Sequence, residues 1–354
     1  MNVLVIGAGP VGLTAALALK SAGIACRIVE KRDAPSVLSR AVGIMPETMR
    51  ALEQLGAGDT IRTEGMAINR MTIKRGSSVL MSLDVSKGGL GNDVMIGLPQ
   101  NRTEEILRDA LHEKGIRPEF GITVEDVSTT DEISTVAFTD GSKDNFDWVI
   151  AADGVHSTAR ECLGINYPGV DLPGKWAIAD VDMSDPFDEG GVTTYVQGHR
   201  NVFVMVLPIE RRRARVVSST DDALAALPEV LNTSGIRQTA TFDISIRQAE
   251  TYNKGRVLLA GDAAHCHSPV GGRGMNLGIA DAIAAAQAIA NGEVGSYTKS
   301  RHAAGARVMA ASEAARKIIV SNNILVKAAT FLATYLAGRI PAFGRMFMRN
   351  LTRL

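Results

Sequence analysis

The first 30 residues, MNVLVIGAGPVGLTAALALKSAGIACRIVE, contain the pattern that decides the fold. Asn2–Ile6 is a short, β-branched apolar run that predicts a buried strand, and it leads directly into a glycine-rich turn at residues 7–12. Residues 11–22, rich in Ala and Leu, predict a helix closed by Gly23, and residues 26–29 predict a second buried strand. A strand, a helix and a strand in this order predict a βαβ unit and a parallel sheet.

The turn GAGPVG has the spacing G-x-G-x-x-G, which is typical of dinucleotide binding when it lies between a strand and a helix. Gly7 permits the tight turn, Gly9 lets the backbone approach a pyrophosphate, and Gly12 lets the helix pack closely on the strand. The helix start at Pro10 and Val11 directs N–H groups and the positive end of the helix dipole at phosphate. This turn is therefore a candidate cofactor contact.

Glu30 ends the second strand, 18 residues after Gly12. A carboxylate at this place can accept hydrogen bonds from a ribose 2′-hydroxyl, and it would repel a 2′-phosphate. We include the adjacent Lys31 among the candidate cofactor contacts. On these residues alone, FAD and NAD both remain possible occupants, whereas NADP is disfavoured at this position.

Two later segments each follow a predicted strand: VIAADGVHSTAR at residues 149–160, and RVLLAGDAAHCHSPVGGRGMNLGIADA at residues 256–282. Together with GAGPVG and Glu30, they resemble the three fingerprints of the flavoprotein aromatic hydroxylases, the para-hydroxybenzoate hydroxylase family. The resemblance extends from residue 1 to about 290, and the last segment follows the family pattern D-A-A-H, P, G-x-G-x-N nearly position for position. It implies FAD as the cofactor.

The resemblance also implies an FAD-dependent monooxygenase. In this family NAD(P)H reduces the flavin, O2 adds at C4a, and the resulting C4a-hydroperoxyflavin hydroxylates an aromatic or polycyclic hydrophobic substrate. A helix beginning near Met275 would place a positive field at the reduced flavin pyrimidine ring. No general base or other catalytic residue is identified, because nothing in the spacing of Tyr195, His199 or Arg215 distinguishes them from core or turn residues.

Family roles transfer residue by residue. Asp262 would contact the ribityl or pyrophosphate region, the backbone of residues 274–276 would hold the pyrimidine edge, and Asp153 and Arg160 would serve FAD and nicotinamide docking. Arg40 and Arg102 could instead be surface or capping arginines, and Asp153 could only cap a helix. The resemblance assigns cofactor contacts to Arg40, Arg102, Val124, Asp153, Arg160, Gly261, Asp262, Pro269, Gly272, Gly274, Met275 and Asn276.

We therefore expect an α/β fold with a discontinuous FAD-binding, Rossmann-like three-layer domain at residues 1–65, 99–174 and 247–298. An inserted, mainly β substrate domain would comprise residues 66–98 and 175–246, and a basic helical region residues 299–354. Further predicted helices cover residues 46–55 and 103–114, the latter capped by Thr103. In the predicted strand VFVMVL, we expect Val202, Val204 and Val206 to face a hydrophobic substrate.

The chain has 38 basic and 38 acidic residues, which argues against a nucleic-acid-binding protein. The run at residues 211–213, together with Arg215, is more typical of a solvated hairpin turn than of a nucleic-acid patch. Residues 299–354 contain ten Lys or Arg and one acid, Glu313, so this region could pack on the acidic remainder of the chain or contact an anionic membrane. We favour packing. The apolar side of this region would comprise Phe331, Leu332, Tyr335, Leu336, Phe343 and Phe347.

Three cysteines far apart exclude a disulfide framework and suit a reducing compartment. His265 and His267 lack further ligands nearby, so no metal site is expected. The apolar stretch at residues 318–338 is interrupted by Asn322, Asn323 and Lys327, and no signal peptide precedes residue 3, so we expect a cytoplasmic protein.

The sequence leaves three functions open. Besides a monooxygenase, the same FAD scaffold could support a reductase or dehydrogenase, or a non-catalytic flavoprotein that binds and sequesters a ligand. Halogenation is disfavoured, because Trp148 and Trp176 do not form the halogenase W-x-W-x-I-P segment. The substrate, the choice of NADH or NADPH and the oligomeric state are not predicted.

Overall fold

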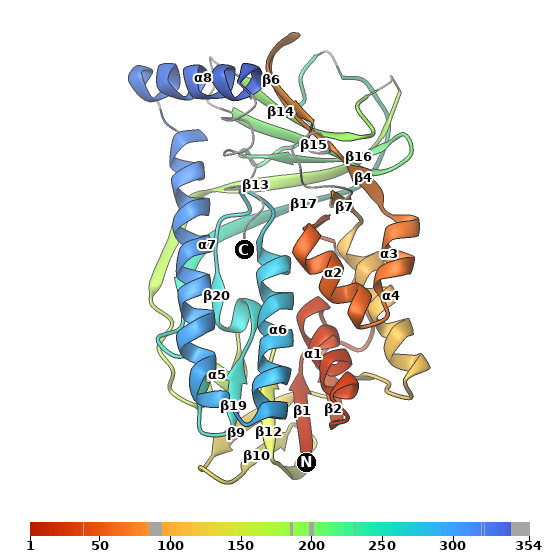
Figure 1. Cartoon of the computed structure of the whole chain (residues 1–354), viewed down its shortest axis with the longest axis vertical. Coiled ribbons are helices and arrows are strands. Elements are labelled where there is room, and N and C mark those ends of the chain that lie inside the picture. Colours follow the sequence, from red (N-terminus) through yellow and green to blue (C-terminus); the bar gives the residue numbers. More distant parts are fainter. Residues whose placement is uncertain are drawn as a thin grey trace.

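A computed structural model describes residues 1–37, 39–84, 94–184, 187–197, 202–229, 231–319, 321 and 323–340. Two sheets lie toward opposite ends of an elongated molecule, and helices line the region beside and between them (Figure 1). His199, Phe343 and Phe347 lie outside the described residues. The predicted α/β class, with an FAD-type domain, a β-rich part and C-terminal helices, is confirmed, whereas the segment boundaries stay a prediction.

The six-stranded sheet has the parallel core that the sequence predicts. Val3 pairs with Cys26 in β2, and Leu4 pairs with Val149 in β12. The central strand β1 is fully buried at Val3, Leu4 and Val5, which explains its uninterrupted apolar run. In spatial order, the sheet contains β18 (Asn253–Lys254), β19 (Val257–Leu259), β12 (Trp148–Ala151), β1 (Asn2–Ile6), β2 (Ala25–Glu30) and β8 (Glu119–Phe120).

Six helices accompany this sheet in the described chain; α1 contacts both α4 and α6, whereas α5 packs on β9 (Val124–Thr129). They are α1 (Pro10–Ser21), α2 (Pro46–Gln54), α3 (Gly58–Glu64), α4 (Gln100–Glu113), α5 (Thr158–Cys162) and α6 (Gly274–Asn291). The prediction that Thr103 caps α4 was wrong. The helix begins three residues earlier, and the Thr103 hydroxyl donates to the Pro99 carbonyl within its first turn at 3.4 Å. The first N–H of the helix, that of Gln100, donates instead to the Ser39 hydroxyl oxygen at 2.9 Å and to the Ala41 carbonyl at 3.0 Å.

Two three-stranded sheets complete this half of the molecule. One is the antiparallel meander β9 (Val124–Thr129), β10 (Ser134–Phe138) and β11 (Lys143–Phe146). The other joins β3 (Gly43–Ile44), β7 (Met95–Gly97) and β4 (Met66–Ile68), which come from distant parts of the chain. This second sheet lies where the chain passes toward the eight-stranded sheet.

The eight-stranded sheet contains, in spatial order, β20 (His265–Cys266), β17 (Thr233–Gln248), β13 (Gly169–Met183), β16 (Arg213–Ser218), β15 (Val202–Glu210), β14 (Gly191–Gln197), β5 (Arg70–Arg75) and β6 (Ser78–Asp84). Neighbouring strands in this sheet are antiparallel, except β14 and β5, which are parallel. One face packs on residues 223–227 and Leu231, and the other meets Ile68 and Val270 from the nucleotide-binding half.

This sheet corrects the prediction for VFVMVL. Val204 and Val206 lie in the cluster on the outer face with Ala223, and Val202 packs against that cluster. Phe203 and Leu207, with Met205 packed beside them, face the nucleotide-binding half instead. Both faces of this strand are apolar, so alternation along the sequence could not tell one face from the other.

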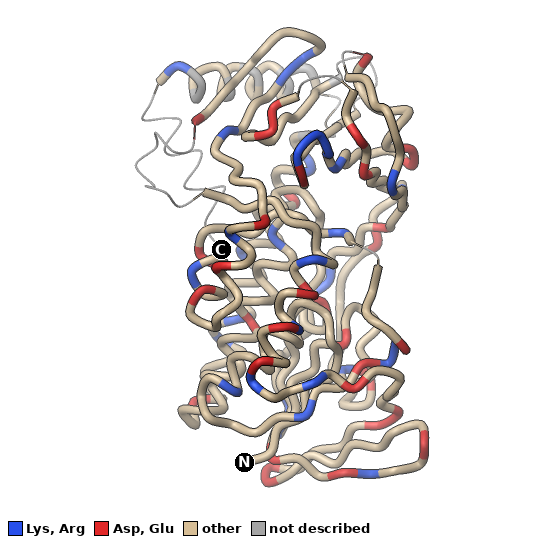
Figure 2. Tube along the Cα trace, turned by 90° about the vertical axis from the view of Figure 1, so that its right-hand side faces the viewer, with Lys and Arg blue, Asp and Glu red and all other residues tan. Residues whose placement is uncertain are grey.

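Arg211 and Arg212 form the turn between β15 and β16, as predicted, and Arg213 begins β16. The prediction was wrong for Arg215, which is buried within β16. The Arg212 N–H donates to Glu189 at 2.8 Å, and Arg213 pairs with Asp182 at 3.2 Å and Glu210 at 2.8 Å. Figure 2 shows basic and acidic residues intermingled along the trace of the described chain. The charge of Arg213 is therefore matched by acids of the neighbouring strands β13 and β15.

The C-terminal part of the described chain consists of α7 (Tyr297–Ile319) and α8 (Ile324–Arg339). α8 lies across the end of the molecule against β6 (Figure 1). Leu332 and Tyr335, expected on its apolar side, are 56% and 37% exposed. Within the described ranges, no helix is long and apolar enough to cross a membrane.

Candidate functional site

The three glycine-containing segments converge at the carboxyl ends of β1, β12 and β19. A methyl group on Gly7 would lie 2.4 Å from the Ala152 carbonyl oxygen of the middle segment. Methyl groups on Gly261 and Gly278 of the last segment would lie 2.9 and 2.6 Å from the Val11 side chain. The backbones of segments more than a hundred residues apart in the sequence therefore pack closely here. They do so at the edge of the sheet where open α/β folds bind ligands.

Two helices begin at this edge without a side-chain cap. Gly9 precedes α1 and Arg273 precedes α6, and neither helix has an acid in its first turn. Uncapped N–H groups and the positive ends of two helix dipoles therefore face the same region, which suits a ligand with a pyrophosphate and a second electron-rich end. Methyl groups on Gly9 and Gly272 would meet no protein atom within 4 Å, so the backbone is open to a ligand there.

Glu30 lies at the end of β2 as predicted, and its carboxylate is already engaged. It accepts hydrogen bonds from the Ala8 N–H at 2.9 Å and from the Arg32 N–H and guanidinium at 3.0–3.2 Å. Burial raises the pKa of Glu30, but these hydrogen bonds outweigh burial and hold the pKa below its usual range. A ribose hydroxyl would have to replace part of the Arg32 contact. The neighbouring Lys31 is exposed.

Asp262 follows β19 at the start of the short 3₁₀ helix Gly261–Ala263. Gly261 has φ +62°, a left-handed conformation that turns the chain sharply after the strand. The Asp262 side chain is accessible to solvent, yet the protein around it displaces enough water to raise the pKa of its carboxyl. Its backbone carbonyl accepts a hydrogen bond from the Tyr167 hydroxyl at 2.9 Å, a contact that sequence reasoning missed.

The N-terminal turn of α6 is held by the fully buried side chain of Asn276. Its carbonyl oxygen accepts from the Met45 N–H at 2.8 Å, and its amide group donates to the Gly43 and Gly272 carbonyls at 2.8 and 3.0 Å. The prediction concerned the backbone of residues 274–276, and the structure adds that this side chain joins β3 to the glycine loop. The Gly272 N–H donates to the Pro269 carbonyl at 2.9 Å, which closes the loop before Gly274 and Met275.

Arg40 and Arg102 differ in their surroundings. The exposed Arg40 side chain lies near enough to Asp262 for its charge to favour the ionised carboxylate. Arg102, on the first turn of α4, pairs with Glu64 at 2.6 Å and Glu105 at 2.7 Å. The structure thus brings Arg40 toward the other candidate residues, whereas Arg102 is engaged by two surface carboxylates.

Asp153 and Arg160 are both tied into the segment after β12. Asp153 accepts from the Ala159 N–H at 3.1 Å, so its side chain does cap the following helix. Arg160 is buried, donates to the Ala263 and Val155 carbonyls at 3.1 and 2.9 Å, and stacks on the Tyr167 ring at 4.0 Å. Arg160 therefore supports the residues after Asp262, and contact of either residue with a cofactor stays a prediction.

Val124 begins β9 as a buried core residue. Two residues before it, the Ile122 N–H donates to the Glu30 carbonyl at 3.0 Å, which places this stretch beside the end of β2. His265 and His267 do not converge on a common ligand, because His265 contacts Asp281 and His267 contacts the Ser268 carbonyl. Among the described residues, no cluster of His, Cys, Asp or Glu could hold a metal ion.

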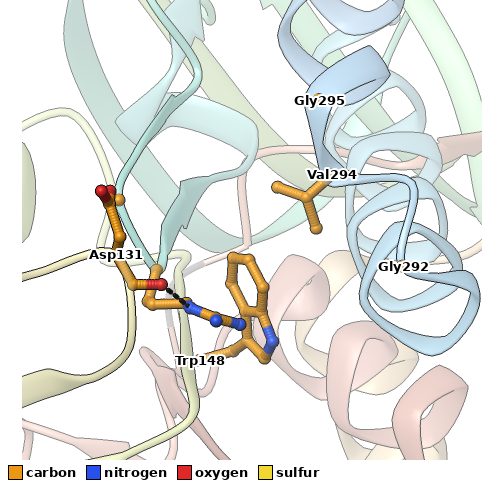
Figure 3. Close-up of a pocket in the computed structure, with 7 residues that line it drawn as sticks. Asp131, Trp148, Gly292, Val294 and Gly295 are labelled. Carbon is orange, nitrogen blue, oxygen red and sulfur yellow. Dashed lines mark hydrogen bonds between the residues drawn. The ribbon is translucent and has the colours of Figure 1, made fainter.

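A separate pocket of about 330 Å³ lies at the opposite edge of the six-stranded sheet (Figure 3). Its lining includes Trp148 and Arg256, whose guanidinium stacks on the indole at 4.4 Å and donates to the Asp131 carbonyl at 2.6 Å. Trp148 begins β12 and Arg256 precedes β19, so this pocket faces the amino ends of the strands. It is not part of the converging glycine site.

Comparison with known proteins decides the family. A family model described as FAD binding domain matches residues 1–312, which cover all three fingerprint segments. The chain belongs to this family of FAD-binding flavoproteins. The predicted resemblance to flavoprotein hydroxylases and the prediction of FAD are thereby confirmed, and the open backbone, uncapped helix starts and polar groups described above fit that cofactor.

Relatives of this flavoprotein include enzymes with different named activities. It is 29% identical to 6-methylpretetramide 4-monooxygenase of Streptomyces rimosus, over 93% of this chain and 64% of that protein. It is 30% identical to dialkyldecalin synthase of Streptomyces rugosporus, over 90% of this chain and 73% of that protein. The chain thus spans less than two thirds of the length of the first relative.

Among solved structures, p-nitrophenol 4-monooxygenase from Pseudomonas putida DLL-E4 superposes with a TM-score of 0.87. The alignment covers 99% of this chain and 98% of that one at 23% identity. At this identity the likeness concerns the fold alone.

Proposed function

We propose that the protein is an FAD-dependent monooxygenase that uses NAD(P)H and O2 to hydroxylate an aromatic or polycyclic hydrophobic substrate. The observation that carries the proposal is the convergence of the three glycine segments at the carboxyl ends of β1, β12 and β19, with two uncapped helix starts at the same edge. The name of the monooxygenase relative, which includes 6-methylpretetramide, supports the reaction type and the substrate class.

In this proposal, residues of the chain bind and orient the cofactor. The start of α1, at Gly9, Pro10 and Val11, holds the pyrophosphate, and Asp262 accepts hydrogen bonds from polyol hydroxyls. The start of α6 holds the electron-rich pyrimidine edge and stabilises negative charge there. Bound FAD supplies the redox chemistry and the activation of oxygen, while the protein excludes water and fixes the substrate.

The substrate lies, in this proposal, against the inner face of the eight-stranded sheet. Trp176, Phe203, Val217 and Val270 belong to one buried cluster there, and Met205 packs beside it. Trp176 and Phe203 have ring centroids 5.8 Å apart. Val270 belongs to the loop that leads into α6, so this apolar face adjoins the expected flavin position and favours a hydrophobic, aromatic compound.

A second candidate function is ring formation without net oxidation, favoured by the dialkyldecalin synthase relative. In that case FAD has a structural or orienting role, and substrate conversion needs neither NAD(P)H nor O2. The same FAD scaffold could also serve a reductase or a flavoprotein that only sequesters a ligand. Ligand-stimulated consumption of NAD(P)H and O2 with formation of an oxygenated product distinguishes the monooxygenase from these three functions.

The direct experiment is anaerobic reduction of the bound flavin by NADH and by NADPH, in the presence of phenols and polycyclic aromatics. The monooxygenase proposal expects one compound class to accelerate bleaching of the flavin absorbance. Flavin that stays oxidised with both nicotinamides and every compound contradicts the proposal. Conversion of a polyene substrate by the oxidised protein would establish ring formation instead.

The finer proposals about location concern the C-terminal helices. We propose a cytoplasmic protein. The favoured packing of the basic region is met at Arg301, which pairs with Asp281 at 2.6 Å. For α8, with its exposed Leu332 and Tyr335 and the basic Arg339, we propose peripheral contact with anionic membranes instead. Sedimentation with phosphatidylserine vesicles at low salt, lost at high salt, is the expected result. Absence of binding at low salt removes this proposal without affecting the reaction.

A further inference from the structure

The turn that presents Asp262 is anchored by a buried charge network to which the sequence fingerprints assign no role. The Ala260 N–H still belongs to the sheet, since it donates to the Ala151 carbonyl at 2.9 Å. The next N–H, that of Gly261, donates to the Asp281 carboxylate of α6 at 3.2 Å. The Asp281 carboxylate thus accepts the first N–H after the sheet hydrogen bonds end, at the residue where the left-handed turn begins.

Asp281 is fully buried and carries two further partners. Arg301 of α7 donates through Nε to one carboxylate oxygen at 2.6 Å, and His265 Nε2 lies 2.5 Å from the other. Burial raises the pKa of Asp281, but His265 and Arg301 outweigh burial and keep the pKa below its usual range. The carboxylate is therefore charged and fixed from two sides, so its position relative to Gly261 is fixed as well.

This network gives one C-terminal arginine a place in the nucleotide-binding half. Arg301 lies beyond residue 298, where we expected a separate basic region, yet its side chain is only 16% exposed. α7 is also joined to β19 through the Tyr297 hydroxyl, which donates to the Leu259 carbonyl at 2.8 Å. The start of α7 therefore lies against the strand that ends at the Asp262 turn.

We propose that Asp281, held by Arg301 and His265, is a positioning residue for FAD: it fixes Gly261 and thereby aims Asp262 at the cofactor. The inference rests on the proposed contact between Asp262 and FAD. None of the three network residues has to touch the cofactor, because their effect passes through one backbone N–H. Loss of the network should therefore weaken FAD binding only while Asp262 is present.

The test is a double-mutant cycle read out by FAD titration of the apoprotein. Asp281→Asn keeps the shape of the side chain and removes the charge, and it should weaken FAD binding about 10- to 100-fold. In an Asp262→Ala background, Asp281→Asn should weaken FAD binding less than about threefold, since the carboxylate that Asp281 positions is gone. Equal losses in both backgrounds overturn the proposal, because they indicate general structural damage.

Tyr297→Phe is the matched control. It removes a buried hydrogen bond to the same strand, two residues before Gly261, without touching Asp281. Its FAD affinity should stay within about twofold of the parent, even if its melting temperature falls. If Tyr297→Phe lowers FAD affinity as much as Asp281→Asn does, a specific role for Asp281 is contradicted.

Arg301→Lys provides a second variant if Asp281→Asn does not fold. It keeps the positive charge but loses the planar fork, so a smaller loss with the same dependence on Asp262 is expected. The two proposals fail separately. If Asp262→Ala leaves FAD affinity unchanged, the Asp262 contact is wrong; if Asp262→Ala weakens binding and neither network variant does, only the positioning role is wrong.

Discussion

Gly12 packs against the carbonyl oxygen of Gly7 so closely that a methyl group on Gly12 would lie 1.8 Å from that oxygen. The contact brings α1 onto the end of β1 and fixes where the helix starts. Gly12→Ala must displace the helix, and it should lower the free energy of unfolding by at least about 3 kcal/mol. Urea unfolding of the apoprotein measures this, and an unchanged midpoint would contradict the close packing.

Gly9→Ala should behave in the opposite way. A methyl group there meets no protein atom within 4 Å, and Gly9 has an ordinary φ of −76°, so the apoprotein should keep its stability within about 0.5 kcal/mol. The methyl group would instead occupy the approach to the pyrophosphate, so FAD affinity should fall. Undiminished FAD binding by a folded Gly9→Ala protein would refute this path for the cofactor.

Asp262→Ala should remove the yellow cofactor from a folded protein. The carboxylate is accessible and lies near Arg40, and it makes no side-chain hydrogen bond that the fold requires among the described contacts. The expected readout is loss of flavin absorbance after gel filtration with an unchanged far-ultraviolet circular dichroism spectrum. Retention of one FAD per chain would count against the assignment.

The ion pair between Arg215 and Asp180 should matter for stability. Both lie on the inner face of the eight-stranded sheet, directly opposite each other, with contacts of 2.6 and 2.7 Å, and Arg215 also donates to the Arg40 carbonyl at 2.9 Å. Arg215→Met leaves a buried carboxylate unpaired and should cost about 3–5 kcal/mol in unfolding free energy.

The neighbouring pair on the same two strands, Arg213 with Asp182, supplies the control for this experiment. Arg213 is more exposed and Asp182 keeps Arg237 as a second partner, so Arg213→Met should cost no more than about 1 kcal/mol. Equal costs for the two variants would show that burial of the Arg215 pair has no energetic consequence.

His267 should make the stability of the apoprotein depend on pH. Burial is the main cause that lowers the pKa of His267 to about 4, because the charged ring would lose its hydration. The unfolded chain therefore binds a proton near pH 6.5 that the folded chain refuses until about pH 4. The neutral ring therefore leaves the free energy of unfolding unaffected above pH 6.5. Acidification from there to pH 4 lowers the free energy of unfolding by about 3 kcal/mol.

His267→Gln should remove this part of the pH dependence. The difference in unfolding free energy between parent and variant, measured by urea titration at several pH values, should shrink from pH 7 to pH 4. Carboxylates that titrate in the same range are common to both proteins and cancel in the difference. A difference that stays constant would show that His267 titrates normally.

The sequence predicted the local elements that have a strong physical signature. Asn2–Ile6, the glycine turn and Glu30 lie where strand pattern, glycine spacing and the βαβ order place them. The sequence could not predict which partners complete the site. The Arg32 contact to Glu30, the Tyr167 contact to Asp262 and the Asp281 contact to Gly261 depend on how distant segments approach one another, and no local pattern encodes that approach. The faces of β15 were mistaken for the same reason, since both are apolar.

The measurement that tests the central proposal most directly is the isotope content of the product formed under isotopically heavy dioxygen. The purified flavoprotein, supplied with NAD(P)H and the compound that best accelerates flavin reduction, should yield a product that contains one labelled oxygen atom. A product that gains no oxygen, or gains it only from water, would contradict a monooxygenase and favour ring formation or reduction instead.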